Sequence, residues 1–353
     1  MTIETDYLIA GTGPAALFHQ LHLRKQSKVV CNIGTGMYGQ LSPDAIPQNG
    51  EKVHILPIFP VFGSDLWKQL DVDFSNVSEL TLKKINHNGS KKPTDYDENS
   101  YTEYLTQING DTNIPFILSY KQFGDIIYHE ELSELKKKVK RNYRSGDPRF
   151  TKVGFDEGLS LYYRFLKKNE PYSILPHKIK KIDVENRVVY AETVNIQYEN
   201  LIYCLPLPTF FKLSAVRRNF DLVYSDALFY TYTCTDPQLQ PNTLYYDCNI
   251  NSNIYRAFIP KENVLAVQVA RNSWSKTPSD IARELTSLLN LQSPPKRIDT
   301  HRYKKCYPLD VTDRKAKENL IKSLKEKNIY LSGRFGTWSY IDLHEVDYEL
   351  FEG

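Results

Sequence analysis

The sequence predicts an α/β protein whose N-terminal sheet is completed by a strand near the C-terminus, with a strand-rich region inserted between the two. Three observations predict this fold class. Residues 6–23 have the order of a short apolar strand, a glycine-rich turn and a helix without breakers. Residues 172–206 form a series of strand-like segments. A last apolar run at 328–332 is followed by glycine, so a final strand is expected there.

The glycine-rich turn has the form G-x-G-x-x-A that opens a dinucleotide-binding βαβ unit. Gly11 permits the tight turn, Gly13 lets a pyrophosphate approach the backbone, and Ala16 allows close packing of helix on strand. The N–H groups at the helix start would face the phosphates. The next strand, expected at 28–32, follows at the right distance. The alternative is a glycine-rich turn in an ordinary α/β sheet. The predicted contacts at this turn are Gly11, Gly13, Pro14, Ala15 and Ala16.

The second strand lacks the acidic residue that usually holds the adenosine ribose in such folds. No Asp or Glu lies between Lys28 and Gly39. Asn32 or Thr35 is expected to offer uncharged hydrogen bonds in its place. A dinucleotide would therefore be held differently, or more weakly, or not at all.

Length and composition bound the class of protein. The 353 residues leave room for two domains or one large domain with an insertion, and a net charge of +3 does not by itself indicate nucleic-acid binding. The N-terminus is acidic where a secretory signal would be basic, and no apolar run approaches the roughly 20 residues of a membrane helix. Five scattered cysteines without Cys-x-x-Cys spacing favour free thiols, a cytoplasmic location and no zinc site. His19 and His22 lie three apart on the first helix but lack a third ligand, so they are expected to face solvent.

The middle of the chain alternates strand-like and helical patterns. Period-two alternation predicts a strand at 78–83, and apolar spacing predicts a helix at 121–145. That helix ends in the basic run 136–144, which is either an anion or nucleic-acid patch or a solvated helix face. The solvated face is favoured, so nucleic acid is not expected but stays open. Further elements are expected at 156–166 (turn and helix), 220–275 (strands), 278–290 (a helix capped by Ser279 or Asp280) and 312–327 (helix).

Four segments together resemble the flavin-containing amine-oxidase and UDP-galactopyranose mutase superfamily, nearest to the mutase branch. They are the N-terminal glycine turn, the segments 154–159 and 178–208, and the C-terminal stretch 307–344 with its Gly-Arg pair after the last strand. The resemblance implies a Rossmann-like FAD-binding domain of the glutathione-reductase type, with FAD held non-covalently. It places this domain at 1–60, 150–215 and 300–353, and a substrate domain at 61–149 and 216–299.

The resemblance also implies further contacts to FAD. Ile179 would contact the adenine through its backbone, and Arg334 would bind the pyrophosphate with two donors, unless it forms a surface ion pair. The N–H groups of Leu343 and His344, at a helix start after Asp342, would face the flavin pyrimidine edge. The implied set is Gly39, Ile179, Gly333, Arg334, Asp342, Leu343 and His344.

On the substrate side, Arg256 resembles an arginine of the family that binds an anionic group, with a cross-strand salt bridge as the alternative. Tyr307 would reach a phosphate or fill a core position, and Trp338 is expected among the aromatic residues lining the substrate site. The chain departs from the mutases at 55–60, where two prolines stand in place of the two histidines of their flavin loop. True galactopyranose mutase activity is therefore not expected.

These features favour a FAD-dependent oxidoreductase that acts on a small, anionic or nucleotide-linked substrate, with phosphate-bearing molecules among the candidates. One alternative is a redox-neutral flavin enzyme with mutase- or lyase-like chemistry. Another is a non-catalytic protein that keeps the fold but has lost FAD. The sequence names no catalytic acid or base and leaves the oligomeric state open.

Overall fold

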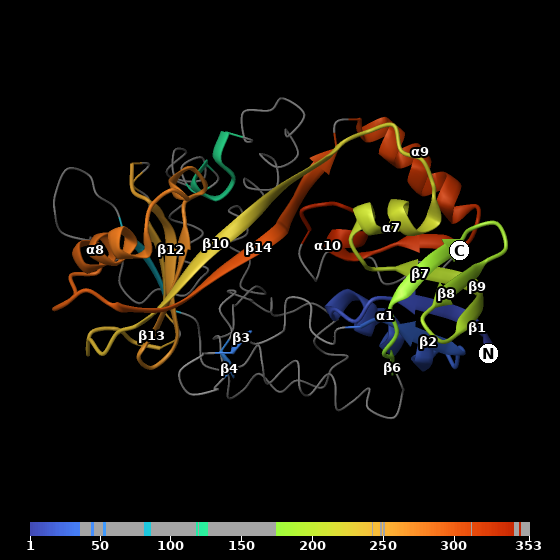
Figure 1. Ribbon diagram of the computed structural model, residues 1–353, viewed down its shortest axis with the longest axis horizontal. Coiled ribbons are helices and arrows are strands. Elements are labelled where there is room, and N and C mark those ends of the chain that lie inside the picture. Colours follow the sequence, from blue (N-terminus) through green and yellow to red (C-terminus); the bar gives the residue numbers. More distant parts are fainter. Residues whose placement is uncertain are drawn as a thin grey trace. The chain divides into compact units, whose positions relative to one another are not determined.

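The fold is taken from a computed structural model (Figure 1). It describes residues 1–35, 44–45, 52–53, 81–85, 118, 120–125, 174–241, 243–247, 249, 251–311, 313–341 and 346. The chain divides into two compact units. The first unit comprises Met1–Ser42, Tyr163–Tyr224 and Pro308–Gly353, and the second comprises Pro43–Tyr162 and Ser225–Tyr307.

The first unit is built on a seven-stranded sheet with the order β6-β2-β1-β9-β8-β7, in which β15 also pairs with β9. Strands β6, β2, β1, β9 and β15 run parallel, whereas β7 and β8 form an antiparallel extension. Because β15 lies next to β9, a strand from the end of the chain completes a sheet begun at its start. The strands are β1 (Thr2–Ala10), β2 (Val30–Ile33), β6 (Ile174–Leu175), β7 (Ile179–Asp183), β8 (Val188–Ala191), β9 (Asn195–Tyr203) and β15 (Ile329–Leu331).

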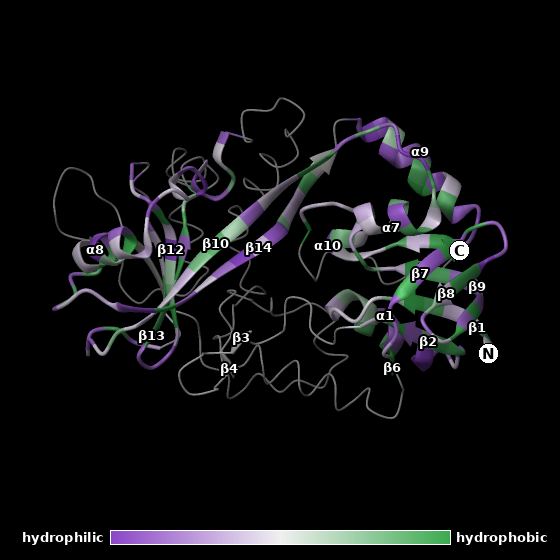
Figure 2. Cartoon of the chain, in the orientation of Figure 1, coloured by the Kyte–Doolittle hydropathy of each residue, from purple (hydrophilic) through white to green (hydrophobic). Residues whose placement is uncertain are grey.

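Helices cover both faces of this sheet, and the period of two along β1 decides which side chains meet them. Tyr7 and Ile9 pack under α1 with Leu23. Leu8 and Ala10 point to the opposite face, where residues of α7 and α9 close the larger core. Hydrophobic colour accordingly fills the central strands in Figure 2, while α9 carries both hydrophobic and hydrophilic residues. The helices are α1 (Pro14–Lys25), α7 (Leu207–Ser214), α9 (Arg314–Lys325) and the short α10 (Gly333–Gly336).

The second unit contains a six-stranded sheet with the order β14-β10-β13-β12-β11-β5. Neighbouring strands β10 to β13 pair antiparallel, and β5 joins β11 in parallel. Helix α8 (Pro278–Leu288) packs its apolar face, including Ile281 and Leu285, on this sheet. The strands are β5 (Thr81–Ile85), β10 (Leu222–Thr233), β11 (Thr243–Asp247), β12 (Ile254–Lys261), β13 (Val264–Val269) and β14 (Lys296–Val311); β3 (Asp44–Ala45) and β4 (Lys52–Val53) form a separate pair, and a 3-10 turn, η4, spans Arg271–Ser273.

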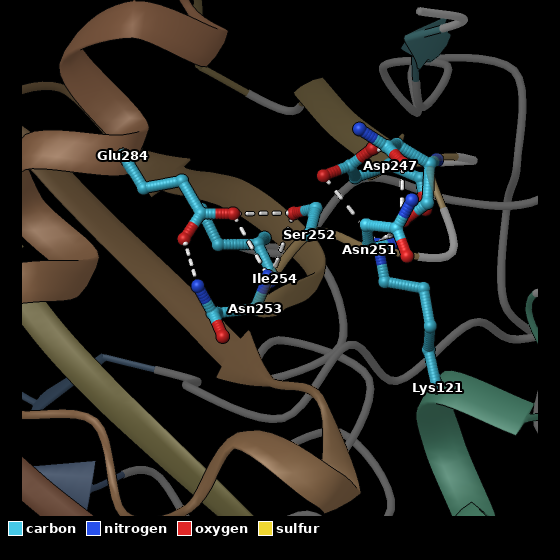
Figure 3. Close-up of polar contacts among 8 residues, drawn as sticks. Lys121, Asp247, Asn251, Ser252, Asn253, Ile254 and Glu284 are labelled. Carbon is cyan, nitrogen blue, oxygen red and sulfur yellow. Dashed lines mark hydrogen bonds and ion pairs between the residues drawn. The ribbon is translucent and has the colours of Figure 1, made fainter.

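Two carboxylates secure the loop between β11 and β12 (Figure 3). Glu284 of α8 accepts hydrogen bonds from the Ser252 hydroxyl and from the backbone N–H and side-chain amide of Asn253, at 2.6–2.8 Å. On the other side, Lys121 Nζ lies 3.4 Å from the Asp247 carboxylate, and both side chains are 1% exposed. The ammonium also donates to the carbonyl oxygens of Asp247 and Asn249. Three oxygen atoms of this segment therefore contact the Lys121 ammonium, as oxygen ligands would contact a metal cation.

The predicted fold class is confirmed. The glycine-flanked strand and helix at the N-terminus, the strands of 172–206 and 220–275, and the helix at 312–327 are present. The N-cap of helix α8 is Thr277, two residues before Ser279 and three before Asp280, and Asp280 completes a capping box with it. The predicted strand at 78–83 is found as Thr81–Ile85, which extends two residues beyond the predicted end. Helical residues occur at 118 and 120–123, whereas the rest of the predicted helix 121–145, its basic run and the predicted helix at 156–166 lie outside the described residues.

Over the part of the chain that is described, no helix is long and apolar enough to span a membrane.

Candidate functional site

The carboxyl ends of the parallel strands of the first unit meet at one edge. The backbone register pairs Ala10 with Ile33 and with Tyr203, and Tyr203 with Leu331. The residues that follow these four positions therefore come together, although they belong to three distant parts of the chain. In open α/β sheets ligands bind outside such carboxyl ends.

Gly11 makes the first turn at this edge. Its N–H donates to the Ile33 carbonyl at 2.9 Å, which continues the β1–β2 pairing by one residue. Its φ of +132° is a conformation that side chains rarely adopt, and an added Cβ would lie 3.2 Å from the Cβ of Cys204. Glycine is thus required here for both conformation and space.

Helix α1 begins directly after this turn and leaves backbone donors at its start. Gly13 is the N-cap and has no side chain to accept a hydrogen bond, and Pro14 occupies the first helical position. The first intrahelical bond runs from Leu17 N–H to the Gly13 carbonyl, so the N–H groups of Ala15 and Ala16 have no acceptor within the helix. Gly13, Pro14 and Ala15 are partly exposed. These donors, at the positive end of the helix dipole, suit a phosphate.

Gly333 is brought against this helix start from the other end of the chain. Ser332 N–H bonds the Tyr203 carbonyl at 2.9 Å, and the chain then turns through Gly333 with φ +71°. A Cβ on Gly333 would lie only 2.8 Å from the Cβ of Ala15. The two glycine segments predicted to contact one cofactor are therefore neighbours in space.

Arg334 follows in α10. Its Nε donates to the Ile341 carbonyl at 2.8 Å, and its guanidinium lies over the ring of Tyr340, 5.0 Å from the centroid. This contact holds the turn that leads to Asp342, Leu343 and His344, which lie outside the described residues, as does Gly39. The predicted pyrophosphate contact of Arg334 stays a prediction.

The side chain of Asn32, the last but one residue of β2, faces α1. Asn32 lies on the same face of β2 as Val30, which packs under α1, and its side-chain amide donates to Gln20 Oε1 of α1 at 3.2 Å. Both amide side chains are completely buried. Ile33 faces the opposite core and is also completely buried. Asn32 therefore connects β2 to α1 through its side chain. Ile179, the other predicted adenosine contact, opens β7 at the edge of the sheet order and is 7% exposed.

Trp338 lies in the larger core of the first unit rather than on a surface. Its side chain is 0% exposed, its Nε1 donates to the Val223 carbonyl at 3.0 Å, and Tyr224 packs edge-on against it. Lys317 holds its carbonyl from α9 at 3.1 Å. These contacts are those of a structural residue, so the packing favours a core role over substrate contact.

Arg256 and Tyr307 come together in the second unit. Arg256 Nη2 donates to the Tyr307 hydroxyl at 3.3 Å, and its Nε donates to Gln268 Oε1 on the adjacent strand at 2.8 Å. Nη1 reaches the Tyr246 hydroxyl at 3.5 Å, and the Tyr255 ring lies under the guanidinium, 5.1 Å away. Arg256 is 8% exposed. Burial by itself lowers the pKa of Arg256, but the surrounding tyrosine oxygens outweigh it and the net direction is upward.

The cross-strand salt bridge considered for Arg256 is not found within the described part of the chain. Gln268, its register partner on β13, is neutral, and the other acceptors are phenols. A buried guanidinium stays charged. Arg256 thus holds a positive charge inside the second unit without a carboxylate among these contacts. Sequence reasoning missed Gln268, because only the strand register shows that it lies opposite Arg256.

His19 corrects a prediction. It was expected to face solvent, but it is 0% exposed and its Nε2 lies 2.6 Å from the Ser332 hydroxyl oxygen. Burial, with a smaller contribution from His22, lowers its pKa from 6.5 to about 3. The prediction failed because the partner of this polar residue is 313 positions away in sequence. Neither residue carries a sequence signal that could have indicated the pair.

Comparison with known proteins identifies the fold. No family model matches the sequence, and no curated protein matches it. Solved structures do: a reduced UDP-galactopyranose mutase superposes with a TM-score of 0.61 at 16% identity, covering 95% of this chain and 91% of the mutase. A fatty acid isomerase from P. acnes that produces CLA gives 0.62 at 12% identity, covering 97% and 96%. A variant of putrescine oxidase gives 0.60 at 11% identity, covering 98% and 97%. At these identities the likeness shows a shared fold, the one that the sequence resemblance implied.

Proposed function

We propose that the protein is a FAD-dependent oxidoreductase acting on a small anionic substrate. The observation that carries the proposal is the meeting of the two glycine segments at the strand-end edge, where Gly333 touches Ala15 at the uncapped start of α1. The backbone N–H groups there have no side-chain cap and could bind a phosphate, whereas a Cβ on Gly333 would be too close to Ala15. The shared fold with a mutase, an isomerase and an oxidase supports the same class of cofactor.

The residues of this edge fit a dinucleotide. Ala15 and Ala16 would offer their N–H groups to the pyrophosphate, and Gly11 and Gly333 keep the space beside it free of side chains. FAD, when bound, supplies transfer of a hydride or an electron pair, and the protein supplies position and electrostatics.

Arg256 supports an anionic substrate. A buried charge without an opposite charge is costly, and a bound anion would offset part of that cost. The Tyr307 hydroxyl and the Gln268 side-chain oxygen each accept a hydrogen bond from the guanidinium and so orient it. A cationic substrate such as putrescine would meet repulsion at this position.

The first test is the visible spectrum of the purified protein, followed by titration with FAD. An oxidised-flavin spectrum, or uptake of added FAD, is expected. A colourless protein that takes up no FAD would overturn the proposal and favour the protein that keeps the fold without the cofactor.

The second test addresses the substrate class. Uridine diphosphate is expected to bind the purified protein in a calorimetric titration, and putrescine is not. Replacing Arg256 with Met removes charge-assisted hydrogen bonds, so affinity for uridine diphosphate should fall roughly tenfold to a hundredfold. Arg302→Met is the matched control, because Arg302 pairs with Asp226 on the surface of the same unit and should leave the affinity unchanged. Equal binding by both variants, or binding of putrescine, would remove the anionic substrate. A large loss of stability in Arg256→Met with unchanged affinity would mean a structural role.

A further inference from the structure

One face of α1 lies against the segment that follows β15. Ala15 and His19 are four residues apart, so they occupy the same face of the helix one turn from each other. Ala15 meets Gly333, and His19 meets the preceding residue, Ser332. Two consecutive residues from the end of the chain are thus matched to two successive turns of the first helix.

The contact between His19 and Ser332 is short and enclosed. The distance from Nε2 to Oγ is 2.6 Å, and the two residues are 0% and 2% exposed. A buried hydrogen bond of this kind is costly to break, because neither group can turn to water instead.

The side chains of His19, Ser332 and Cys204, which form this cluster, are neutral. Burial lowers the pKa of His19 to about 3 and raises the pKa of the Cys204 thiol, which lies beside Ser332, to about 12. A protonated thiol is a poor nucleophile, so the cluster has no reactive cysteine. The hydrogen bond therefore sets geometry rather than charge.

The main chain of Ser332 is bonded to the sheet, whereas its side chain is bonded to α1. Ser332 N–H is bound to the Tyr203 carbonyl of β9, so the main chain is fixed to the sheet. The link from this strand end to α1 then passes through the Ser332 hydroxyl and the close contact of Gly333 with Ala15. The His19–Ser332 hydrogen bond is therefore one of two direct contacts between this strand end and α1.

We propose that His19 and Ser332 are positioning residues of the dinucleotide site, which hold the N–H groups at the start of α1 in register with the segment that begins at Gly333. The inference rests on the proposed binding of FAD. Neither residue needs to touch the cofactor, since the pair acts on the spacing of the two segments that do. Preorganisation of this kind raises affinity by reducing the cost of ordering the site on binding.

The experiment measures the Kd for FAD by quenching of flavin fluorescence, together with the melting temperature of the FAD-free protein. Ser332→Ala removes a single oxygen atom and should weaken FAD about threefold to tenfold, the equivalent of one hydrogen bond. Thr5→Val is the matched control. Thr5 is a buried residue whose hydroxyl bonds the carbonyl oxygens of Tyr7 and Val29, but it lies on β1 five residues before Ala10, toward the opposite edge. It should lower the melting temperature without changing the Kd.

The pair is tested as a pair with His19→Leu and the double variant His19→Leu/Ser332→Ala. If the hydrogen bond acts as a unit, the double variant should bind FAD no more weakly than either single one. His19→Gln keeps a hydrogen-bonding group and should bind within about twofold of the wild type. Additive losses, no recovery in His19→Gln, or an equal change in Kd for Ser332→Ala and Thr5→Val would each overturn the positioning role. Failure of the wild type itself to bind FAD would instead refute the proposed function.

Discussion

The buried histidine should make the first unit sensitive to mild acid. His19 has a pKa of about 3 in the folded protein and 6.5 as its ordinary value. Between these values the unfolded chain takes up a proton that the folded chain does not, so stability is present above pH 6.5 and is lost as the pH falls toward 3. Replacing His19 with Gln keeps a partner for Ser332 but removes the titration.

The size of the effect follows from the shift. Each unit of difference in pKa corresponds to about 1.4 kcal/mol, so the full shift amounts to roughly 5 kcal/mol. Between pH 7.5 and pH 5 only part of it is reached, and His19 should cost about 2 kcal/mol there. The pKa values of Asp183 and Glu192 are also lowered, mainly by hydrogen bonds from backbone N–H groups, but they are the same in both proteins and cancel in the comparison.

Urea unfolding followed by tryptophan fluorescence provides the assay. Trp338 is completely buried in the first unit, and changing Trp67 and Trp274 to Phe leaves it as the sole indole. In that background the wild-type sequence at position 19 should lose about 2 kcal/mol more than His19→Gln between pH 7.5 and pH 5. Equal losses in both proteins would refute the reasoning, because they would mean that His19 can be protonated in the folded state.

Three further substitutions test other contacts. Gly333→Ala should destabilise the first unit by about 1–3 kcal/mol and weaken FAD, because φ is +71° and the new Cβ would lie 2.8 Å from that of Ala15; thermal melting and FAD titration measure both. Lys121→Met should destabilise the second unit by about 3–5 kcal/mol by leaving the Asp247 carboxylate buried without its cation, as measured by urea unfolding at neutral pH. Ile33→Glu should cost roughly 3–5 kcal/mol in a urea titration and bring no gain in FAD affinity, because it buries a carboxylate in the core of the first unit; tighter FAD binding in a folded variant would contradict this.

The glycine turn could be predicted from sequence because its requirements are local. A positive φ at Gly11 and at Gly333 restricts the residue type at each position, and the flanking apolar runs mark the strands. The close approach of Gly333 to Ala15 could be expected only because parallel strands from both ends of the chain share one sheet.

Side-chain partners across the fold could not be predicted in the same way. His19 and Asn32 are polar residues in apolar surroundings, and their burial depends on Ser332 and Gln20, which local patterns do not pair with them. Trp338 shows the same limit. An aromatic residue near a Gly-Arg pair fits a substrate site and a core equally well until its neighbours are known.

The end of β2 lacks the acidic residue that holds the ribose in related folds, and this affects how a dinucleotide could be bound at the strand-end edge. Ile33 is enclosed in the core, and a Cβ on Gly34 would lie 2.9 Å from Thr12 Cγ2, so neither position at the end of β2 has room for an acidic side chain without repacking. The side-chain amide of Asn32 is hydrogen-bonded to Gln20. If FAD binds here, its affinity has to come more from the pyrophosphate end than from the ribose. The separation of the α1 start from Gly333 would then matter more than in a site with a ribose carboxylate, and the two contacts that span it are the His19–Ser332 hydrogen bond and the packing of Gly333 on Ala15.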